Sequence, residues 1–379
     1  MFKNLKTICF SFTLFSFLLI QANTNKKKIL TIGGAQKDIL LLSKKNQNTF
    51  LLKGQKIELE NPDETSFPGG GAVNGAIAFK KLDYDVSTFL KIGNDKTGKF
   101  FIKELEKRNI STDDIIISPK FGTGTSYLIP TDDGDNSVLV YRGTNEHLKI
   151  DEIPNKSIAK SFLIYITSLS KESIQILQPV LDEARKNNTI IALIPTKAQL
   201  TQECETLKKS LEYVDILFLN KREAILLSKN LPTNITKSEN ESTYPKLLKH
   251  EFVLEEFVKQ IIKFGPKIIV VTNGSDGAYV ATNDTLFYHP SISTTVISTT
   301  GAGDAFASTF TAELFKEKNS INSINNEDVE KAICYGILNS TSVISHLSAN
   351  EGLLSQEKLD EKFKENKTNL IQKFSLEQY

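Results

Sequence analysis

The sequence predicts an α/β fold, in which a doubly wound parallel sheet is covered by helices on both faces. Apolar runs of strand length alternate with segments whose apolar residues recur at helical spacing, and this alternation is typical of parallel sheets with crossover helices. The strand candidates are residues 29–32, 86–92, 162–166, 190–194, 215–219 and 267–271. The helix candidates are residues 72–81, 96–109, 171–187, 199–211, 221–228 and 251–263, with three more beginning at 302, 327 and 357.

Two segments, about residues 38–60 and 123–141, break this alternation. In the second, the strand-like runs Ser126–Ile129 and Val138–Tyr141 flank the turn sequence Asp132–Asp135. Such a pattern is typical of a β-hairpin. We therefore expect a small β element outside the main sheet.

The first strand leads into a candidate binding loop. Ile29–Ile32 is apolar, Gly33 and Gly34 follow it, and Asp38 lies a few residues later. Ligands of open parallel sheets bind at the carboxyl ends of the strands, so we expect Asp38 to face that crevice. Taken alone, an acid at such a position is more often a solvated loop residue.

A second glycine-rich segment runs directly into a helix. Gly69–Gly71 precede Asn74 and the apolar pattern that begins at Ala76. Small residues let a ligand approach the backbone, and the amide of Asn74 can both donate to and accept from a polyhydroxyl substrate. The alternative is a surface turn without a ligand.

The most informative segment is Ser298–Phe306, which places a carboxylate beside glycine residues at a helix start. Gly301 and Gly303 permit a tight backbone with unpaired N–H groups, and these favour bound negative charge together with the helix dipole. Asp304 could accept the proton of an attacking alcohol during phosphoryl transfer. The segment is neither a Walker loop nor a dinucleotide fingerprint, and by itself it could be an ordinary helix start.

In this order and spacing, the three segments resemble the ribokinase family of sugar and nucleoside kinases, also called the PfkB-type family. Asn220–Glu223 is similar to that family's Asn-x-x-Glu motif, and Thr272–Gly277 is similar to its nucleotide-binding Thr-x-Gly-x-x-Gly turn. The resemblance covers about residues 29 to 365. It implies a Rossmann-like sandwich of the ribokinase type, in which segments 38–60 and 123–141 form a small β lid over the substrate.

The resemblance also implies an activity and a role for each matched residue. The activity is transfer of the γ-phosphate of ATP to a hydroxyl, with Asp304 as general base. Gly301, Ala302 and Gly303 complete the catalytic group, in which backbone amides bind the transferred anion. The substrate would contact Asp38, Gly70, Gly71 and Asn74. ATP would contact Asn220, Glu223, Thr272, Gly274 and Gly277, with Asn220 and Glu223 also acting on Mg²⁺ through water.

One position departs from the family pattern. Potassium-activated relatives usually carry an acid where this chain has Ser298, three residues before Gly301. A carboxylate offers a cation a full charge, whereas a hydroxyl offers only a dipole. We therefore expect weak or absent dependence on a monovalent cation.

The expected acceptor is a small ribose-like sugar. A phosphosugar would need cationic partners, but Gly71 stands where several sugar-kinase relatives have lysine, and Arg142 is the one obvious cation nearby. An adenosine-type nucleoside is the second candidate, because Phe67, Phe121 or Tyr127 could stack on a base. A non-catalytic sensor with the same fold is the third.

Composition and charge narrow the expected partners. The chain has 46 basic and 45 acidic residues, so nucleic acid is not an expected partner. Its three cysteines are far apart in the sequence and form no metal-binding or redox spacing. The resemblance implies a possible homodimer through the lid, and the polar segment 229–250 is predicted to be a surface insertion.

The N-terminus leaves the localisation open. Residues 1–24 read as a signal-like leader, because Lys3 and Lys6 precede the apolar stretch Ile8–Ile20. The kinase domain is assigned to residues 25–379. The need for ATP favours the cytoplasm, whereas the leader favours export or membrane association.

Overall fold

The computed structural model describes residues 26–42, 63–130, 136–231, 253–365 and 370–376. The leader, most of lid segment 38–60, the hairpin turn at Asp132–Asp135 and nearly all of the insertion at 229–250 lie outside these residues. Within the described ranges, no helix is both long enough and apolar enough to cross a membrane.

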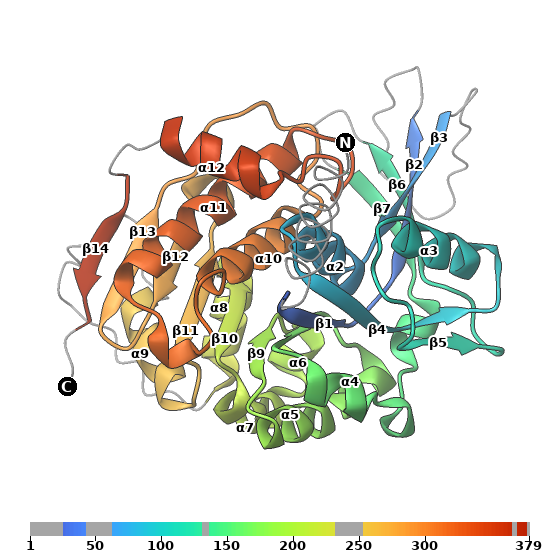
Figure 1. Ribbon diagram of the computed structural model, residues 1–379, viewed down its shortest axis with the longest axis horizontal. Helices are drawn as coiled ribbons and strands as arrows, with labels where there is room; N and C mark the ends of the chain where they lie inside the picture. The colour runs from blue at the N-terminus through green and yellow to red at the C-terminus, as the bar shows by residue number, and fades with distance from the viewer. Residues whose placement is uncertain (1–25, 43–62, 131–135, 232–252, 366–369, 377–379) are drawn as a thin grey trace, which may run out of the picture.

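The main sheet has ten strands in the order β14-β13-β12-β11-β10-β9-β8-β1-β4-β5 (Figure 1). The parallel part comprises β1 (Lys28–Ile32), β4 (Asp85–Gly93), β5 (Ile115–Ser118), β8 (Leu163–Ile166), β9 (Ile190–Leu193), β10 (Ile216–Asn220) and β11 (Ile268–Thr272). All six strands expected from the sequence are present. Their apolar runs are buried on both faces, as crossover helices require.

One edge of this sheet differs from the expectation of a parallel sheet. The strands β12 (Ala278–Ala281), β13 (Thr285–His289) and β14 (Gln372–Ser375) pair antiparallel. The turn between β12 and β13 is too short for a helical crossover, so the second strand must return beside the first. The sheet is therefore mixed, with an antiparallel edge for which the sequence analysis gave no strand candidates.

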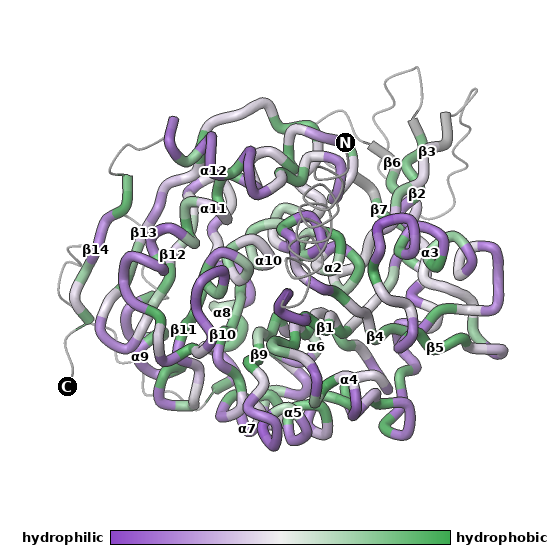
Figure 2. The backbone as a smooth tube through the Cα atoms, in the orientation of Figure 1, coloured by the Kyte–Doolittle hydropathy of each residue, from purple (hydrophilic) through white to green (hydrophobic). Residues whose placement is uncertain are grey.

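Helices cover both faces, and each face has its own hydrophobic core. The first core joins α2 (Gly71–Lys81), α3 (Lys96–Lys107), α10 (Ala302–Leu314), α11 (Asn326–Ile344) and α12 (Gln356–Glu365). The second joins α4 (Asn155–Lys160), α5 (Leu177–Lys186), α6 (Lys197–Thr201), α7 (Cys204–Ser210), α8 (Lys221–Asn230) and α9 (Leu254–Lys263). Figure 2 shows the hydrophobic segments gathered along the strands and along α10, with hydrophilic residues toward the periphery. The doubly wound prediction is confirmed.

A separate four-stranded sheet with the order β3-β2-β6-β7 stands beside this body (Figure 1). It contains β2 (Gln36–Leu42), β3 (Asp63–Gly69), β6 (Thr125–Pro130) and β7 (Asn136–Tyr141). β6 and β7 form the expected hairpin, and β2 joins it by pairing parallel to β6. This second sheet is the small β lid.

Candidate active site

The helix start at Gly301 is built as the sequence suggests. Gly301 is left-handed with φ of 80°, and a Cβ there would lie 2.2 Å from Cβ of Ala349. Its carbonyl accepts the first helical hydrogen bond, from Ala305 N. A Cβ at Gly303 would meet nothing within 4 Å, so the first turn of α10 is open on that side. The Ala302 N–H already donates to the Thr299 carbonyl oxygen over 3.3 Å, which leaves the N–H groups of Gly303 and Asp304 to face a ligand.

Asp304 lies in that first turn, and Asn74 holds its side chain. Asn74 Nδ2 donates to Asp304 Oδ2 over 2.8 Å, which joins α2 to α10. Burial raises the pKa of Asp304, and the hydrogen bond from Asn74 partly opposes this shift. A carboxylate with little solvation and a raised pKa takes a proton more readily than a solvated one. These properties are compatible with the general-base role that the sequence analysis expects of Asp304.

Asp38 reaches the same crevice from the lid strand β2. Ser126 Oγ donates to Asp38 Oδ1 over 2.8 Å. Burial and the charge of Asp304 raise the pKa of Asp38 to about 6, against the hydrogen bond from Ser126. The charge of Asp304 acts on Asp38, so the two carboxylates lie near each other. The structure thus brings Asp38, from the lid, near Asp304, from α10.

The glycines before α2 bring its backbone close to the loop after β1. Gly70 has φ of 91°, and a Cβ there would lie 2.5 Å from the Gly34 carbonyl oxygen. At Gly71 a Cβ would lie 2.8 Å from Cβ of Thr167. The space that a lysine would need at position 71 is therefore occupied by Thr167.

Asn145 is a positioning residue that the sequence analysis missed. Ala35 N donates to Asn145 Oδ1 over 2.9 Å, and Asn145 Nδ2 donates to the Ala35 carbonyl oxygen over 2.8 Å. These two bonds fix the chain where it leaves β1 for the lid, three residues before Asp38. A lone asparagine after the strand β7 carries no sequence signal for this role.

The expected ATP residues gather at the ends of β10 and β11. Asn220 and Thr272 are paired in register on these adjacent parallel strands. Beyond Thr272 the chain turns through Gly274, with φ of 54°, and Gly277, with φ of 100°. A Cβ at Gly277 would lie 2.1 Å from the His289 carbonyl oxygen, so only glycine fits this turn. The structure thus brings together two motifs whose first residues, Asn220 and Thr272, are 52 positions apart in the sequence.

The Asn-x-x-Glu motif forms the cap of α8. Asn220 Oδ1 accepts from Glu223 N over 3.0 Å, and Glu223 Oε2 accepts from Asn220 N over 2.8 Å. This reciprocal capping box fixes both side chains at the strand ends. Burial raises the pKa of Glu223, which these hydrogen bonds partly oppose.

The described residues fit a magnesium ion that is held mainly by phosphate and water. Among these residues, no group of three or more His, Cys, Asp or Glu side chains is placed to bind a metal. Mg²⁺ with a nucleotide commonly keeps several waters and uses one or two carboxylates. Glu223, which retains acceptor capacity beside the cap, and Asn220 could contact such an ion through water.

Ser298 is buried, and its hydroxyl is used within the chain. Its Oγ accepts a hydrogen bond from Thr300 N over 3.2 Å. The hydroxyl thus orients the turn before Gly301 without supplying a charge.

Comparison with known proteins agrees with this geometry. The model of the pfkB family of carbohydrate kinases matches residues 26–356. The ribokinase of Staphylococcus aureus (strain COL) is 23% identical over 294 residues, which cover 78% of this chain and 88% of the relative.

Solved structures show the same fold. A putative ribokinase II from E. coli in complex with ATP and Mg²⁺ has a TM-score of 0.70 at 18% identity and covers 90% of this chain and 100% of its own. A nucleoside kinase from Methanocaldococcus jannaschii has a TM-score of 0.67 at 19% identity, with coverage of 90% and 100%. The resemblance inferred from the motifs is confirmed, and the chain belongs to the pfkB family of carbohydrate kinases.

Proposed function

We propose that this carbohydrate kinase transfers the γ-phosphate of ATP to a hydroxyl of a small, unphosphorylated, ribose-like sugar. The observation that carries the proposal is that the half-buried carboxyls of Asp38 and Asp304 lie close enough to interact, and that Asn74 donates a hydrogen bond to Asp304 in the first turn of α10. Carboxylate and amide groups suit the hydroxyls of a sugar.

In this proposal Asp304 acts as the general base. Asp38 and Asn74 orient the sugar, and the reacting hydroxyl gives its proton to the Asp304 carboxylate as its oxygen attacks phosphorus. The N–H groups of the first turn of α10 stabilise the charge on the transferred phosphoryl group. Mg²⁺, when bound with ATP, would neutralise phosphate charge, with Asn220 and Glu223 contacting it through water.

The space around Gly71 favours an acceptor without phosphate. Thr167 fills the volume that a cationic side chain would need there, and Arg142 is exposed at the end of β7. A phosphosugar bound without a cation beside its phosphate would lose the charge-assisted hydrogen bonds that usually hold it.

A nucleoside acceptor is the second candidate, and the fold shared with the Methanocaldococcus jannaschii nucleoside kinase supports it. Phe67 pairs with Asp38 across β3 and β2, so it lies where a base could stack. Phe121 is less suited, because His147 already stacks on it at a centroid distance of 3.6 Å. We rank the nucleoside below the sugar on this ground.

The lid supports a further proposal, that two copies of the chain pair through it. Val138, Leu139, Val140 and Tyr141 on the edge strand β7 are each about half exposed, at 47%, 52%, 51% and 53%. An apolar edge strand of this kind needs a partner or a cover to avoid uncontrolled association.

The test of the kinase proposal is ADP release with Mg-ATP against ribose, other free sugars, phosphosugars and nucleosides. The variant Asp304→Asn keeps the shape and the Asn74 contact but removes the base, which should lower kcat about 10²–10⁴-fold. ATP binding measured by calorimetry should be unchanged. ATP binding without turnover on any acceptor would instead support the non-catalytic sensor.

A further inference from the structure

A cavity of about 490 Å³ lies along α2, away from Asp38 and Asp304, and it includes Phe67, the residue considered above for stacking on a nucleoside base. Its walls come from β3, α2, α3 and the segment that follows α11. It is lined by Ser66, Phe67, Pro68, Ile77, Lys80, Lys81, Phe100, Glu104, Arg108, Ser348, Asn350 and Glu351. This volume lies within the range of small-molecule sites. Asn74 and Lys81 are seven residues apart on α2, which is about 10 Å along the helix axis.

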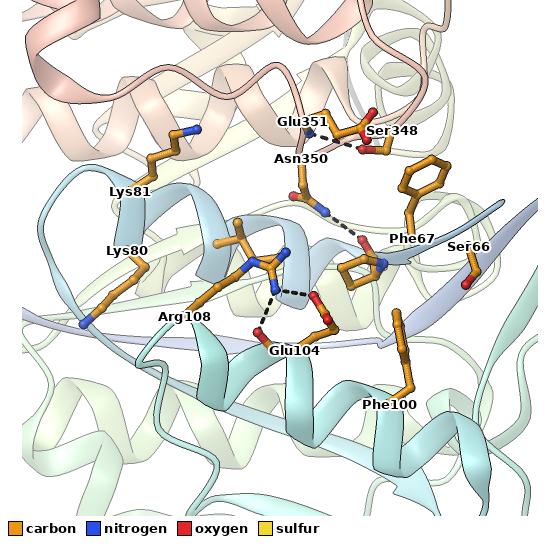
Figure 3. A pocket seen from close by; sticks show the side chains of 12 residues that line it. Ser66, Phe67, Lys80, Lys81, Phe100, Glu104, Arg108, Ser348, Asn350 and Glu351 are labelled. Carbon is orange, nitrogen blue, oxygen red and sulfur yellow. Dashed lines mark hydrogen bonds and ion pairs between the residues drawn. The ribbon is translucent and has the colours of Figure 1, made fainter.

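The cavity has a cationic side and an aromatic side. Figure 3 shows Lys81, at the end of α2, and Arg108, just after α3, on one side, with Phe67 and Phe100 on the other. Arg108 Nη1 donates to the carbonyl and carboxylate of Glu104. Its remaining guanidinium donors have no hydrogen-bond partner among the described residues, and neither has the ammonium of Lys81.

The positive charges of Lys81, Arg108 and Lys358 repel one another. The pKa of Lys81 is lowered, first by burial and then by the charges of Lys358 and Arg108. A bound anion would remove that repulsion, and an Arg and a Lys that line one side of a cavity can supply the charge-assisted donors that a phosphate uses. Glu104 accepts hydrogen bonds from only one guanidinium nitrogen of Arg108, so this side of the cavity keeps an excess of positive charge.

We propose that this cavity binds a phosphomonoester with a small apolar or planar body, as a second ligand distinct from ATP and from the acceptor. The phosphate would lie against Lys81 and Arg108, and the body of the ligand would lie between Phe67 and Phe100. A sugar phosphate and a nucleoside monophosphate share this chemistry, so both belong in the test.

The cavity is connected to the proposed active site by hydrogen bonds. Asn350, in its wall, donates from Nδ2 to the Pro68 carbonyl oxygen over 2.6 Å and to Asn74 Oδ1 over 3.1 Å. Asn74 in turn donates to Asp304. Asn350 Oδ1 is buried without a partner among the described residues, so a small shift of this side chain toward a ligand group would gain a hydrogen bond. A ligand in the cavity would thereby alter the position of Asn74.

The experiment is calorimetric titration of the full chain with inorganic phosphate, glucose 6-phosphate and AMP. Each is added to protein already saturated with Mg-ADP and with an acceptor sugar, so that the proposed active site is filled. We expect one phosphomonoester to bind with a Kd in the range of about 10⁻⁶ to 10⁻³ M. Lys81→Ala with Arg108→Ala should weaken that binding about ten-fold or more, without changing activity in the absence of the ligand.

The matched control is Lys103→Ala with Lys107→Ala, which removes the same charge from the exposed face of α3 and should bind normally. The ligand should also change the affinity for the acceptor, and the acceptor should change ligand affinity by the same factor. Asn350→Ala should retain ligand binding and reduce this coupling.

Three results would overturn the proposal. They are no binding of any of the three compounds up to about 10 mM, equal loss in the two double variants, and displacement of the ligand by the acceptor sugar. None of these readouts requires turnover, so failure of the second site is distinguishable from failure of the kinase proposal.

Discussion

Replacing Asp38 with asparagine should stabilise the protein at neutral pH and not at acid pH. Burial and the Asp304 carboxylate raise the pKa of Asp38 from 3.8 to about 6. This rise in the pKa of Asp38 corresponds to about 3 kcal/mol against its ionised form in the folded state. Because the folded pKa lies above the unfolded one, the stability contributed by the protonated group is complete below about pH 4 and is lost as the pH rises through 6.

Asp38→Asn removes the loss of stability that ionisation of Asp38 causes, and it keeps an oxygen that accepts the hydrogen bond from Ser126. The difference in unfolding free energy between the variant and the original protein should be small near pH 4 and should grow to about 3 kcal/mol by pH 7. Urea unfolding followed by circular dichroism at several pH values measures it, since the chain contains no tryptophan. Acceptor binding should weaken in the same variant.

A matched control replaces the exposed Glu357 with glutamine, which removes a carboxylate that lies outside the crevice. The variant Ser126→Ala should move the pH window upward, because the hydrogen bond from Ser126 favours the ionised form of Asp38. If Asp38→Asn and the original protein lose stability in parallel from pH 4 to 7, Asp38 is solvated, and the reasoning about a shared crevice is refuted.

Three further predictions concern the turn before α10 and the lid. Gly301→Ala should lower the free energy of unfolding by about 2 kcal/mol or more, because Gly301 has a positive φ and a Cβ there would contact Ala349. Gly303→Ala should change it by no more than about 1 kcal/mol. Equal losses for the two variants, measured by thermal or urea unfolding, would contradict the strained turn. Activity should be nearly the same in potassium and in tetramethylammonium salts, with Ser298→Asp increasing the potassium effect; strong stimulation of the original protein would contradict this. Light scattering at micromolar concentration should show a dimer, and Leu139→Lys should reduce the measured mass to that of one chain, 42.3 kDa. A monomeric mass for the original protein would exclude pairing through the lid.

The central part of the fold could be predicted because local and tertiary preferences agree there. The strands β1, β4, β8, β9, β10 and β11 are apolar runs that only a doubly covered sheet can bury, and glycines mark the turns into helices. Asp38 was singled out because it follows the end of a strand, whereas Asn74 and Asp304 were singled out because glycine-rich segments precede them at helix starts.

The antiparallel edge and the supporting contacts could not be predicted in this way. β14 is short, polar and partly exposed, and it joins the sheet by pairing with β13, which is about 85 residues earlier in the chain. Thr167 and Asn145 act through close packing and hydrogen bonds with residues distant in sequence. Neither kind of contact leaves a periodic or motif signal in the residues that make it.

The half-buried carboxyls of Asp38 and Asp304 also bear on whether this protein transfers phosphate or only binds a ligand. Burial raises the pKa of both Asp38 and Asp304, so keeping each ionised at neutral pH lowers the stability of the folded chain. Asparagine at either position would keep an acceptor oxygen for a sugar hydroxyl and avoid that cost. A binding protein would lose little by such a replacement, whereas a kinase would lose its base at Asp304. The presence of a destabilising acid beside the open N–H groups of α10 therefore favours catalysis over a sensor role.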